Sequence, residues 1–312
     1  MIKQIKIVFM GTPNIAVSML KRILADGYEV IGVVTQPDKK VGRKQIVQMP
    51  PVKEIALQEG IPVFQPYKIA QDYEEILALE ADLIVTCAYG QFIPQRVLEA
   101  PTYGSINVHA SLLPKLRGGA PIHKAIINGD QETGISIMRM VKKMDAGAVM
   151  AQCVVAIDED ETNGTLYDKL AVAGADLLSQ SIPKLIDGTA KFIEQDEDKA
   201  TFAYTISKEE EHVDFTMPLQ QVYDHIRGLI PAPAGYAVVN GKKMKFHKVR
   251  KAIGSHTHEA GEIIGLQDGA LAVAVEGGYI LLDELQMEGK ARVDAKAFYN
   301  GAGKNLVGQI MK

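Results

Sequence analysis

The chain has 312 residues, 47% of them hydrophobic and 23% charged, which is long enough for two domains that each bury a core and excludes a disordered protein. Its formal net charge of -4 restricts any nucleic-acid contact to local basic regions. No apolar run approaches a membrane span, and the opening MIKQIKIVFMGT becomes polar too early for a signal peptide, so we expect a cytoplasmic protein.

The first half alternates apolar runs with helix-period segments. IKIVFM and YEVIGVVT predict strands, whereas NIAVSMLKRILADG and PPVKEIALQEG predict helices. Further strands are predicted at 83–88, 106–109, 134–139 and 148–156, and a long helix from 164 to about 185. This alternation predicts a doubly wound, mostly parallel α/β sheet.

The charged, aperiodic stretch DGTAKFIEQDEDKATFAYTISKEE predicts a connection between two bodies. We place a first domain at 1–189, a linker at 190–207 and a second domain at 208–312. The second domain is expected to contain a helix over 219–229 and then short alternating strands, with a hairpin at Val239-Asn240-Gly241. It is therefore predicted to be a small β-barrel.

Several common kinds of site are disfavoured. The first strand is followed by a single glycine, Gly11, where a dinucleotide fingerprint needs G-x-G-x-x-G. Cys87 and Cys153 lie in apolar runs and are interpreted as free core thiols. His256 and His258 have no third ligand at suitable spacing, so we interpret them as a surface pair and expect no metal.

Asn107 and His109 lie two residues apart at the end of a predicted strand. Side chains at i and i+2 point to the same side, and ligands of open α/β sheets bind beyond the carboxyl ends of the strands. Asp145, in the turn-like Lys143–Gly147, is a carboxylate that could orient the imidazole. Together the three groups could stabilise an oxyanion and move a proton, although strand-end polar residues without a function are common.

Cations concentrate in two regions. The loop 36–51 contains Lys39, Lys40, Arg43 and Lys44. The segment GKKMKFHKVRK contains Lys242, Lys243, Lys245, Lys248, Arg250 and Lys251, and Lys208 lies at the domain junction. Such density is typical of a phosphate-binding surface, but a charge run is also an ordinary solvated face, and composition leaves both open.

The run INVHASLLPKLRGGAPI with the later MDAG resembles the catalytic signature of the 10-formyltetrahydrofolate-dependent formyltransferases. The stretches MGTPNIAVSML, TQPDKKVGRKQ, AYGQFIP, NGTLYDKLA and TISKEEEHVDF are similar to the members that act on initiator methionyl-tRNA. The resemblance implies a Rossmann-like formyltransferase domain followed by an OB-like domain, with 10-formyltetrahydrofolate as the formyl donor. One departure is GLIPAPAGY, where relatives often carry Trp and this chain has none.

The resemblance also implies roles for individual residues. Asn107, His109 and Asp145 would be catalytic, and the basic residues named above would contact the tRNA, those of the 36–51 loop at its acceptor end. The residues expected to flank the folate are Ser111, Leu112, Leu113, Pro114, Gln91, Phe92 and Ile93. We expect a monomer.

Two alternatives remain open. A formyltransferase for a sugar nucleotide or ribonucleotide amine, or a formyl-folate hydrolase, would share the chemistry but would not need the basic regions. A non-catalytic RNA-binding protein would not need Asn107, His109 and Asp145. A formyl-transfer assay with methionyl-tRNA separates these possibilities.

Overall fold

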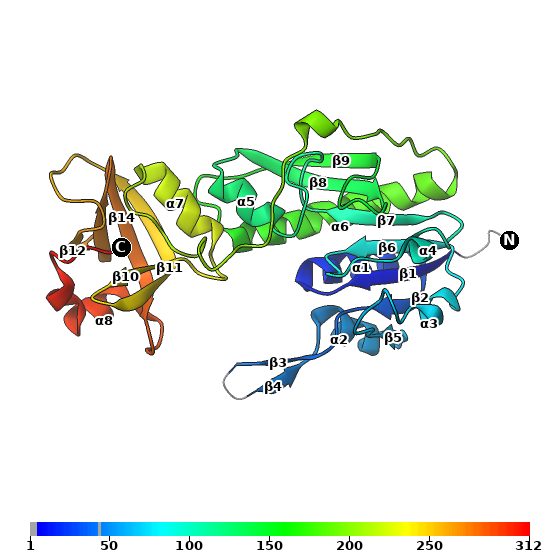
Figure 1. Ribbon diagram of the computed structural model, residues 1–312, viewed down its shortest axis with the longest axis horizontal. Coiled ribbons are helices and arrows are strands. Elements are labelled where there is room, and N and C mark those ends of the chain that lie inside the picture. The colour runs from blue at the N-terminus through cyan, green and yellow to red at the C-terminus, as the bar shows by residue number, and fades with distance from the viewer. Residues whose placement is uncertain (1–4, 43–44) are drawn as a thin grey trace. The chain divides into compact units, whose positions relative to one another are not determined.

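The computed structural model describes residues 5–42 and 45–312, which form two compact units (Figure 1). The first unit comprises Met1–Pro121, Thr133–Ala156 and Tyr167–Tyr204, and the second comprises Ile122–Glu132, Ile157–Leu166 and Thr205–Lys312. Two of the predicted tRNA contacts, Arg43 and Lys44, lie outside the described residues.

A seven-stranded sheet in the order β5-β2-β1-β6-β7-β8-β9 organises the first unit. Its strands are β1 (Lys6–Gly11), β2 (Glu29–Val34), β5 (Val63–Phe64), β6 (Leu83–Cys87), β7 (Ser105–His109), β8 (Glu132–Arg139) and β9 (Val149–Ala156). The pairings from β5 to β7 are parallel, whereas β7 pairs with β8 in the antiparallel sense. The predicted mostly parallel α/β sheet is confirmed.

Helices of the same unit cover this sheet. They are α1 (Asn14–Ala25), α2 (Pro51–Gln58), α3 (Glu74–Leu77), α4 (Gln95–Leu98) and most of α6 (Asn163–Ile186). Nearly all of α5 (Pro121–Ile127) belongs to the second unit. Val8 and Met10 pack in one cluster with residues of α3 and α4, while Ile7 and Phe9, which alternate with them, are also fully buried. Both faces of β1 are therefore covered, as expected for a doubly wound sheet.

The sequence did not reveal the structure of the 36–51 loop. Part of it forms an antiparallel hairpin of β3 (Lys39–Val41) and β4 (Ile46–Gln48), and every residue of both strands is exposed. Three-residue strands with no buried face show no apolar alternation, so the pattern predicted only a loop. The short helix α5 was also missed, because it begins inside the stretch RGGAPI, whose two glycines and proline indicate a loop.

The second unit is built on an antiparallel sheet in the order β10-β11-β14-β13-β12, with β15 beside β14. Its elements are α7 (Leu219–Gly228), β10 (Tyr236–Val239), β11 (Lys242–Ile253), β12 (Ile263–Gln267), β13 (Ala270–Val275), β14 (Gly278–Met287), β15 (Val293–Asp294), α8 (Ala295–Asn300) and the 3-10 turn Gly303–Leu306. Asn240 and Gly241 adopt positive φ (49° and 73°), which confirms the predicted hairpin turn.

Backbone hydrogen bonds of the last residues connect the two edge strands of that sheet. Lys312 exchanges both backbone hydrogen bonds with Val238 in β10, and Gln309 accepts one from Ile263 in β12. This closure encloses a core that includes Phe246 of β11 and Ile226 of α7, both fully buried. The predicted small β-barrel therefore has the expected antiparallel, closed character.

Both cysteines are free, and Cys87 is buried, as predicted. The prediction that Cys153 lies in the core is wrong, because it is half-buried on β9, the last strand in the order of the sheet. Within 5–42 and 45–312, no helix combines the length and the apolar character needed to cross a membrane.

Candidate active site

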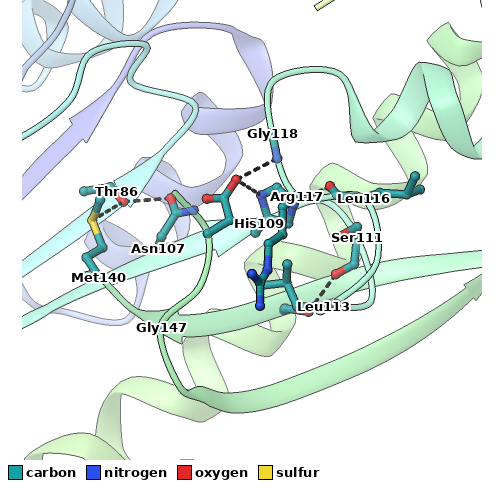
Figure 2. A network of polar contacts seen from close by, with 12 residues as sticks. Thr86, Asn107, His109, Ser111, Leu113, Leu116, Arg117, Gly118, Met140 and Gly147 are labelled. Atoms are coloured by element: carbon teal, nitrogen blue, oxygen red, sulfur yellow. Dashed lines mark hydrogen bonds and ion pairs between the residues drawn. The ribbon is translucent and has the colours of Figure 1, made fainter. Parts of the chain in front are cut away.

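Asn107 and His109 extend from the same side of β7, where the strand ends (Figure 2). His109 is 6% exposed and Asn107 is half-buried. The i, i+2 spacing therefore brings the carboxamide and the imidazole together, as the sequence predicted.

Thr86 of the neighbouring strand β6 fixes the Asn107 carboxamide. The two residues face each other in the parallel register, and Thr86 Oγ1 donates to Asn107 Oδ1 at 2.7 Å. Because Oδ1 serves as the acceptor, the Nδ2 group presents its hydrogens elsewhere, and no hydrogen bond ties it to another described residue. Asn107 thus offers a neutral, oriented N–H donor.

His109 is held by a backbone carbonyl of the loop that follows β7. Its Nε2 lies 3.0 Å from the Leu116 oxygen, so Nε2 carries a hydrogen and donates it. Its Nδ1 lies 3.7 Å from Asp145 Oδ2, which is too long for a hydrogen bond but close enough for an ion pair when the ring is protonated. Sequence reasoning missed Leu116, because a carbonyl contact leaves no signature in side-chain type.

Asp145 lies in the turn between β8 and β9, and its Oδ2 also accepts the Gly118 N–H at 2.8 Å. The structure therefore brings all three predicted catalytic residues together, although they come from segments nearly forty positions apart. The groups can supply N–H donors to a developing negative charge, together with a carboxylate and an imidazole for proton movement.

The Ser111–Pro114 loop is held rigidly beside this site. Leu113 N donates to Ser136 Oγ at 3.0 Å, the Leu113 carbonyl accepts from Gln152 Nε2 at 2.9 Å, and Ser111 Oγ donates to the Lys115 carbonyl at 2.6 Å. Ser111 and Leu113 are buried, while Leu112 and Pro114 are half-buried. The polar atoms of the loop are thus used internally, and its half-buried side chains are apolar.

The other three predicted folate contacts, Gln91, Phe92 and Ile93, differ in how exposed their side chains are. Gln91 uses both ends of its side chain within the unit, because Oε1 accepts from Ile69 N at 2.9 Å and Nε2 donates to the Pro66 carbonyl at 3.1 Å. Phe92 is 75% exposed, whereas Ile93 packs against the hydrophobic cluster that Val8 and Met10 form with residues of α3 and α4. Of the three, only the Phe92 ring is fully available to a ligand.

Catalysis by the buried thiol of Cys87 and binding of a metal ion have no support in the described residues. Burial raises the pKa of the Cys87 thiol to about 12, so this buried side chain remains a thiol and not a nucleophilic thiolate. No group of three or more His, Cys, Asp or Glu side chains in 5–42 and 45–312 is placed to hold a metal ion.

The basic residues of β11 differ in their surroundings. Arg250 pairs with Asp283 at 2.8 Å, Lys251 pairs with Glu159 at 2.6 Å and Lys245 donates to the Pro233 carbonyl at 3.0 Å. Lys243 lies 3.9 Å from the centre of the Tyr236 ring. Lys242 and Lys248 are exposed and have no partner among the described residues.

The remaining predicted tRNA contacts are also at the surface. Lys39 and Lys40 are exposed on β3, and Lys208 is exposed at the start of the last stretch of the second unit.

Comparison with known protein families identifies the chain. Residues 5–182 match the family described as formyl transferase, and residues 205–303 match the formyl transferase C-terminal domain. The chain belongs to the formyl transferase family. The resemblance inferred from the sequence motifs is thereby confirmed.

Relatives within this family are similar over almost their full length. Methionyl-tRNA formyltransferase of Bacillus cereus is 51% identical over 301 residues, which cover 95% of this chain and 96% of that protein. The protein of the same name from Bacillus cytotoxicus is 50% identical, covering 96% of each chain.

Solved structures share the fold at much lower identity. An N-formyltransferase of Helicobacter canadensis, in complex with folinic acid and dTDP-3-aminofucose, has a TM-score of 0.69 and 19% identity, covering 89% of this chain and 98% of that chain. HypX of Aquifex aeolicus has a TM-score of 0.71 and 15% identity, covering 98% of this chain and 50% of that chain.

Proposed function

We propose that the protein transfers a formyl group from 10-formyltetrahydrofolate to the α-amino group of initiator methionyl-tRNA, giving N-formylmethionyl-tRNA for translation initiation. The observation that carries the proposal is the convergence of Asn107, His109 and Asp145 at the end of β7. The substrate is supported by relatives that bear the name methionyl-tRNA formyltransferase and are 50 to 51% identical over nearly the whole chain.

This reaction explains why the site offers donors and a carboxylate and no nucleophile. The substrate amine attacks the formyl carbon, and the carbonyl oxygen becomes an oxyanion in a tetrahedral intermediate. The bond from carbon to the folate nitrogen then breaks, while the attacking nitrogen loses a proton and the leaving nitrogen gains one. The enzyme must therefore stabilise one negative charge and guide one proton.

Each residue of the trio suits one of these tasks. The unengaged Nδ2 of Asn107 donates to the oxyanion, and an oriented donor of this kind is typically worth about 10² to 10³ in rate. His109 donates its Nε2 hydrogen once the oxyanion competes with the Leu116 carbonyl. Asp145 stabilises the protonated ring at 3.7 Å and helps pass the proton to the leaving nitrogen.

The folate and the tRNA would contact different surfaces. Ser111, Leu112, Leu113 and Pro114, with Gln91, Phe92 and Ile93, would flank the folate, with Phe92 as the ring free to contact it. The tRNA would contact the two basic regions and Lys208. The regions comprise Lys39, Lys40, Arg43 and Lys44, and Lys242, Lys243, Lys245, Lys248, Arg250 and Lys251. Exposure supports this assignment for most of the described members, whereas Lys245 and Lys251 are half-buried.

The same proposal includes the organisation of the protein. It comprises a catalytic domain over 1–189, a linker over 190–207 and a tRNA-binding domain over 208–312. The protein acts as a monomer in the cytoplasm. Sedimentation of the purified chain tests the monomer, since a dimer at working concentration contradicts it.

The test of function is a formyl-transfer assay with initiator and elongator methionyl-tRNA side by side. We expect transfer to the initiator, with a clear preference over the elongator. Formylation of an amino sugar nucleotide in place of methionyl-tRNA contradicts the proposed substrate. Release of formate without transfer identifies a hydrolase, and RNA binding without either reaction identifies a non-catalytic protein.

A further inference from the structure

The turn that carries Asp145 has a backbone that needs support. Asp145 adopts φ of +47°, in the left-handed region that favours glycine. Two residues later, a Cβ on Gly147 would collide with the Arg139 carbonyl, so the turn passes directly against the end of β8. Contacts from elsewhere in the unit must hold Asp145 in this conformation.

Gln195 makes those contacts. Its Nε2 donates to the Asp145 carbonyl at 2.7 Å and to the Gly147 carbonyl at 2.8 Å. A carboxamide nitrogen has two hydrogens, so each hydrogen is used by one carbonyl of the turn. The Oε1 of the same side chain accepts from Arg117 Nε at 3.0 Å and Nη2 at 2.8 Å. The whole amide is therefore engaged.

Arg117 fixes Gln195 in turn. It is fully buried, and its Nη2 also pairs with Glu197 at 3.0 Å, in the 3-10 turn Glu197–Lys199. Its backbone N–H donates to the Thr201 carbonyl at 2.9 Å, and its carbonyl accepts from Ala203 N at 2.7 Å. The stretch from 195 to 203 is thus bonded along its length to the loop after β7.

The residues that flank Arg117 contact the catalytic groups directly (Figure 2). The Leu116 carbonyl accepts the hydrogen of His109, and the Gly118 N–H donates to the Asp145 carboxylate. Asp145 is consequently held at two points, its carboxylate by Gly118 and its carbonyl by Gln195. Arg117 bonds Gln195 and directly precedes Gly118 in the chain, so these contacts form a closed circuit.

We propose that Gln195 is a positioning residue for Asp145, and that it controls the rate of formyl transfer without touching a reacting atom. The inference rests on the proposed function, in which Asp145 acts with His109. Without the two N–H donors, the turn relaxes from its left-handed conformation and the carboxylate moves relative to the imidazole. Displacements of about 1 Å are enough to cost roughly 10²-fold in rate.

Two variants test the proposal. Gln195→Met removes the whole amide, whereas Gln195→Glu keeps an oxygen facing Arg117 but replaces the N–H donors with an acceptor that faces two carbonyls. We expect kcat to fall by about 10- to 100-fold in both, with KM for methionyl-tRNA and for the formyl donor within about threefold. Gln95→Met is the matched control and should leave both constants unchanged, because the side chain of this exposed glutamine bonds only Glu99 among the described residues.

A double-mutant cycle shows whether the effect passes through Asp145. If it does, adding Gln195→Glu to Asp145→Ala lowers kcat by less than about twofold, because the group being positioned is already absent. Because Arg117 donates to this position, the carboxyl group introduced by Gln195→Glu should stay ionised and offer no hydrogen to the turn. A fall in kcat with both KM values unchanged is a readout that a general structural defect would not give.

The outcomes separate the two proposals. Failure of the wild-type protein to formylate methionyl-tRNA contradicts the proposed function. If the wild-type protein is active and needs Asp145, but the Gln195 variants turn over normally, only the positioning role is overturned. The positioning role is also overturned if Gln195→Glu lowers kcat by the same factor with and without Asp145→Ala, because the two residues then act independently. Should Gln195→Met fail to fold, Gln195→Glu alone completes each comparison.

Discussion

The polar groups around the end of β7 are held by buried or half-buried partners, whereas the cations of β11, in the other unit, lie at or near the surface. Hydrogen bonds to Thr86, Leu116 and Gly118 fix Asn107, His109 and Asp145 respectively. On β11, Lys242 and Lys248 are exposed without described partners. Transition-state stabilisation requires fixed donors, whereas phosphate binding tolerates mobile charges, and the two regions differ accordingly.

The largest effect should follow from removing a group of the fixed region. We expect His109→Ala or Asp145→Ala to lower kcat by at least about 10²-fold while binding of the formyl donor largely survives, because both groups act mainly on the transition state. Single-turnover formylation combined with a donor-binding titration measures the two quantities separately. Wild-type turnover in either variant would remove that residue from the mechanism.

A smaller effect should follow from loosening one fixed group without removing it. Thr86→Val deletes the hydroxyl that orients the Asn107 amide, and the loss of a hydrogen bond worth about 1 kcal/mol corresponds to roughly fivefold in kcat. Thr86→Ser keeps the hydroxyl and serves as the control. Equal rates for the Val and Ser variants would show that the amide does not need this contact.

Variants of β11 should change binding but not chemistry. We expect Lys242→Gln with Lys248→Gln to weaken binding of any tRNA and to reduce the slope of log K against log salt by about 0.7 to 0.9 for each lysine–phosphate interaction that the substitutions remove. The rate at saturating tRNA should stay unchanged. Affinity measured across a salt series checks this.

Arg250→Gln provides the contrast on the same strand. Its guanidinium is already paired with Asp283, so its removal should change the salt slope less than removal of Lys248. If Arg250→Gln has the larger effect, internal pairing does not decide which cations of β11 bind phosphate.

The smallest effect concerns pH. Burial lowers the pKa of His123 and His225 below the ordinary value of 6.5, although each ring bonds a backbone carbonyl. The folded state therefore resists protonation of these rings, so the unfolded state binds more protons once the pH falls below about 6.5. Stability of the second unit should decline modestly between pH 7.5 and 5.5.

Thermal unfolding over this range, compared with His225→Gln, checks the prediction. Titration of Glu197 in the first unit does not affect stability between pH 7.5 and 5.5. Its hydrogen bond from Arg117, with a second from Lys143, lowers its pKa to about 2, so its contribution is complete above about 4.5 and is lost only at lower pH. An unchanged unfolding temperature between pH 7.5 and 5.5 would refute the histidine effect.

Sequence reasoning succeeded where a local pattern determines geometry. The i, i+2 spacing was enough to place Asn107 and His109 on one face, and Asn240-Gly241 was enough to predict a hairpin turn. Alternating apolar runs also predicted the sheet and the second, antiparallel unit. These features depend on neighbours in the chain.

Sequence reasoning did not reveal contacts between residues that are far apart in the chain. The partners of Arg250 and Lys251 are Asp283 and Glu159, so no local pattern distinguishes these cations from Lys242. Gln195 lies in a charged, aperiodic stretch that predicts only a connection, although its amide reaches fifty residues back to Asp145. A fragment ending at Thr189 would lack this contact and would therefore misrepresent the intact site.

The demands on the Gln195 side chain have an evolutionary consequence. The position requires two N–H donors for the turn and an oxygen acceptor for Arg117. Asparagine is one methylene too short, lysine and arginine offer no acceptor, and glutamate offers no donor when ionised. No single substitution can replace glutamine while Arg117 and the Asp145 turn stay as they are, so we expect these three positions to diverge together in descendants of this sequence or not at all.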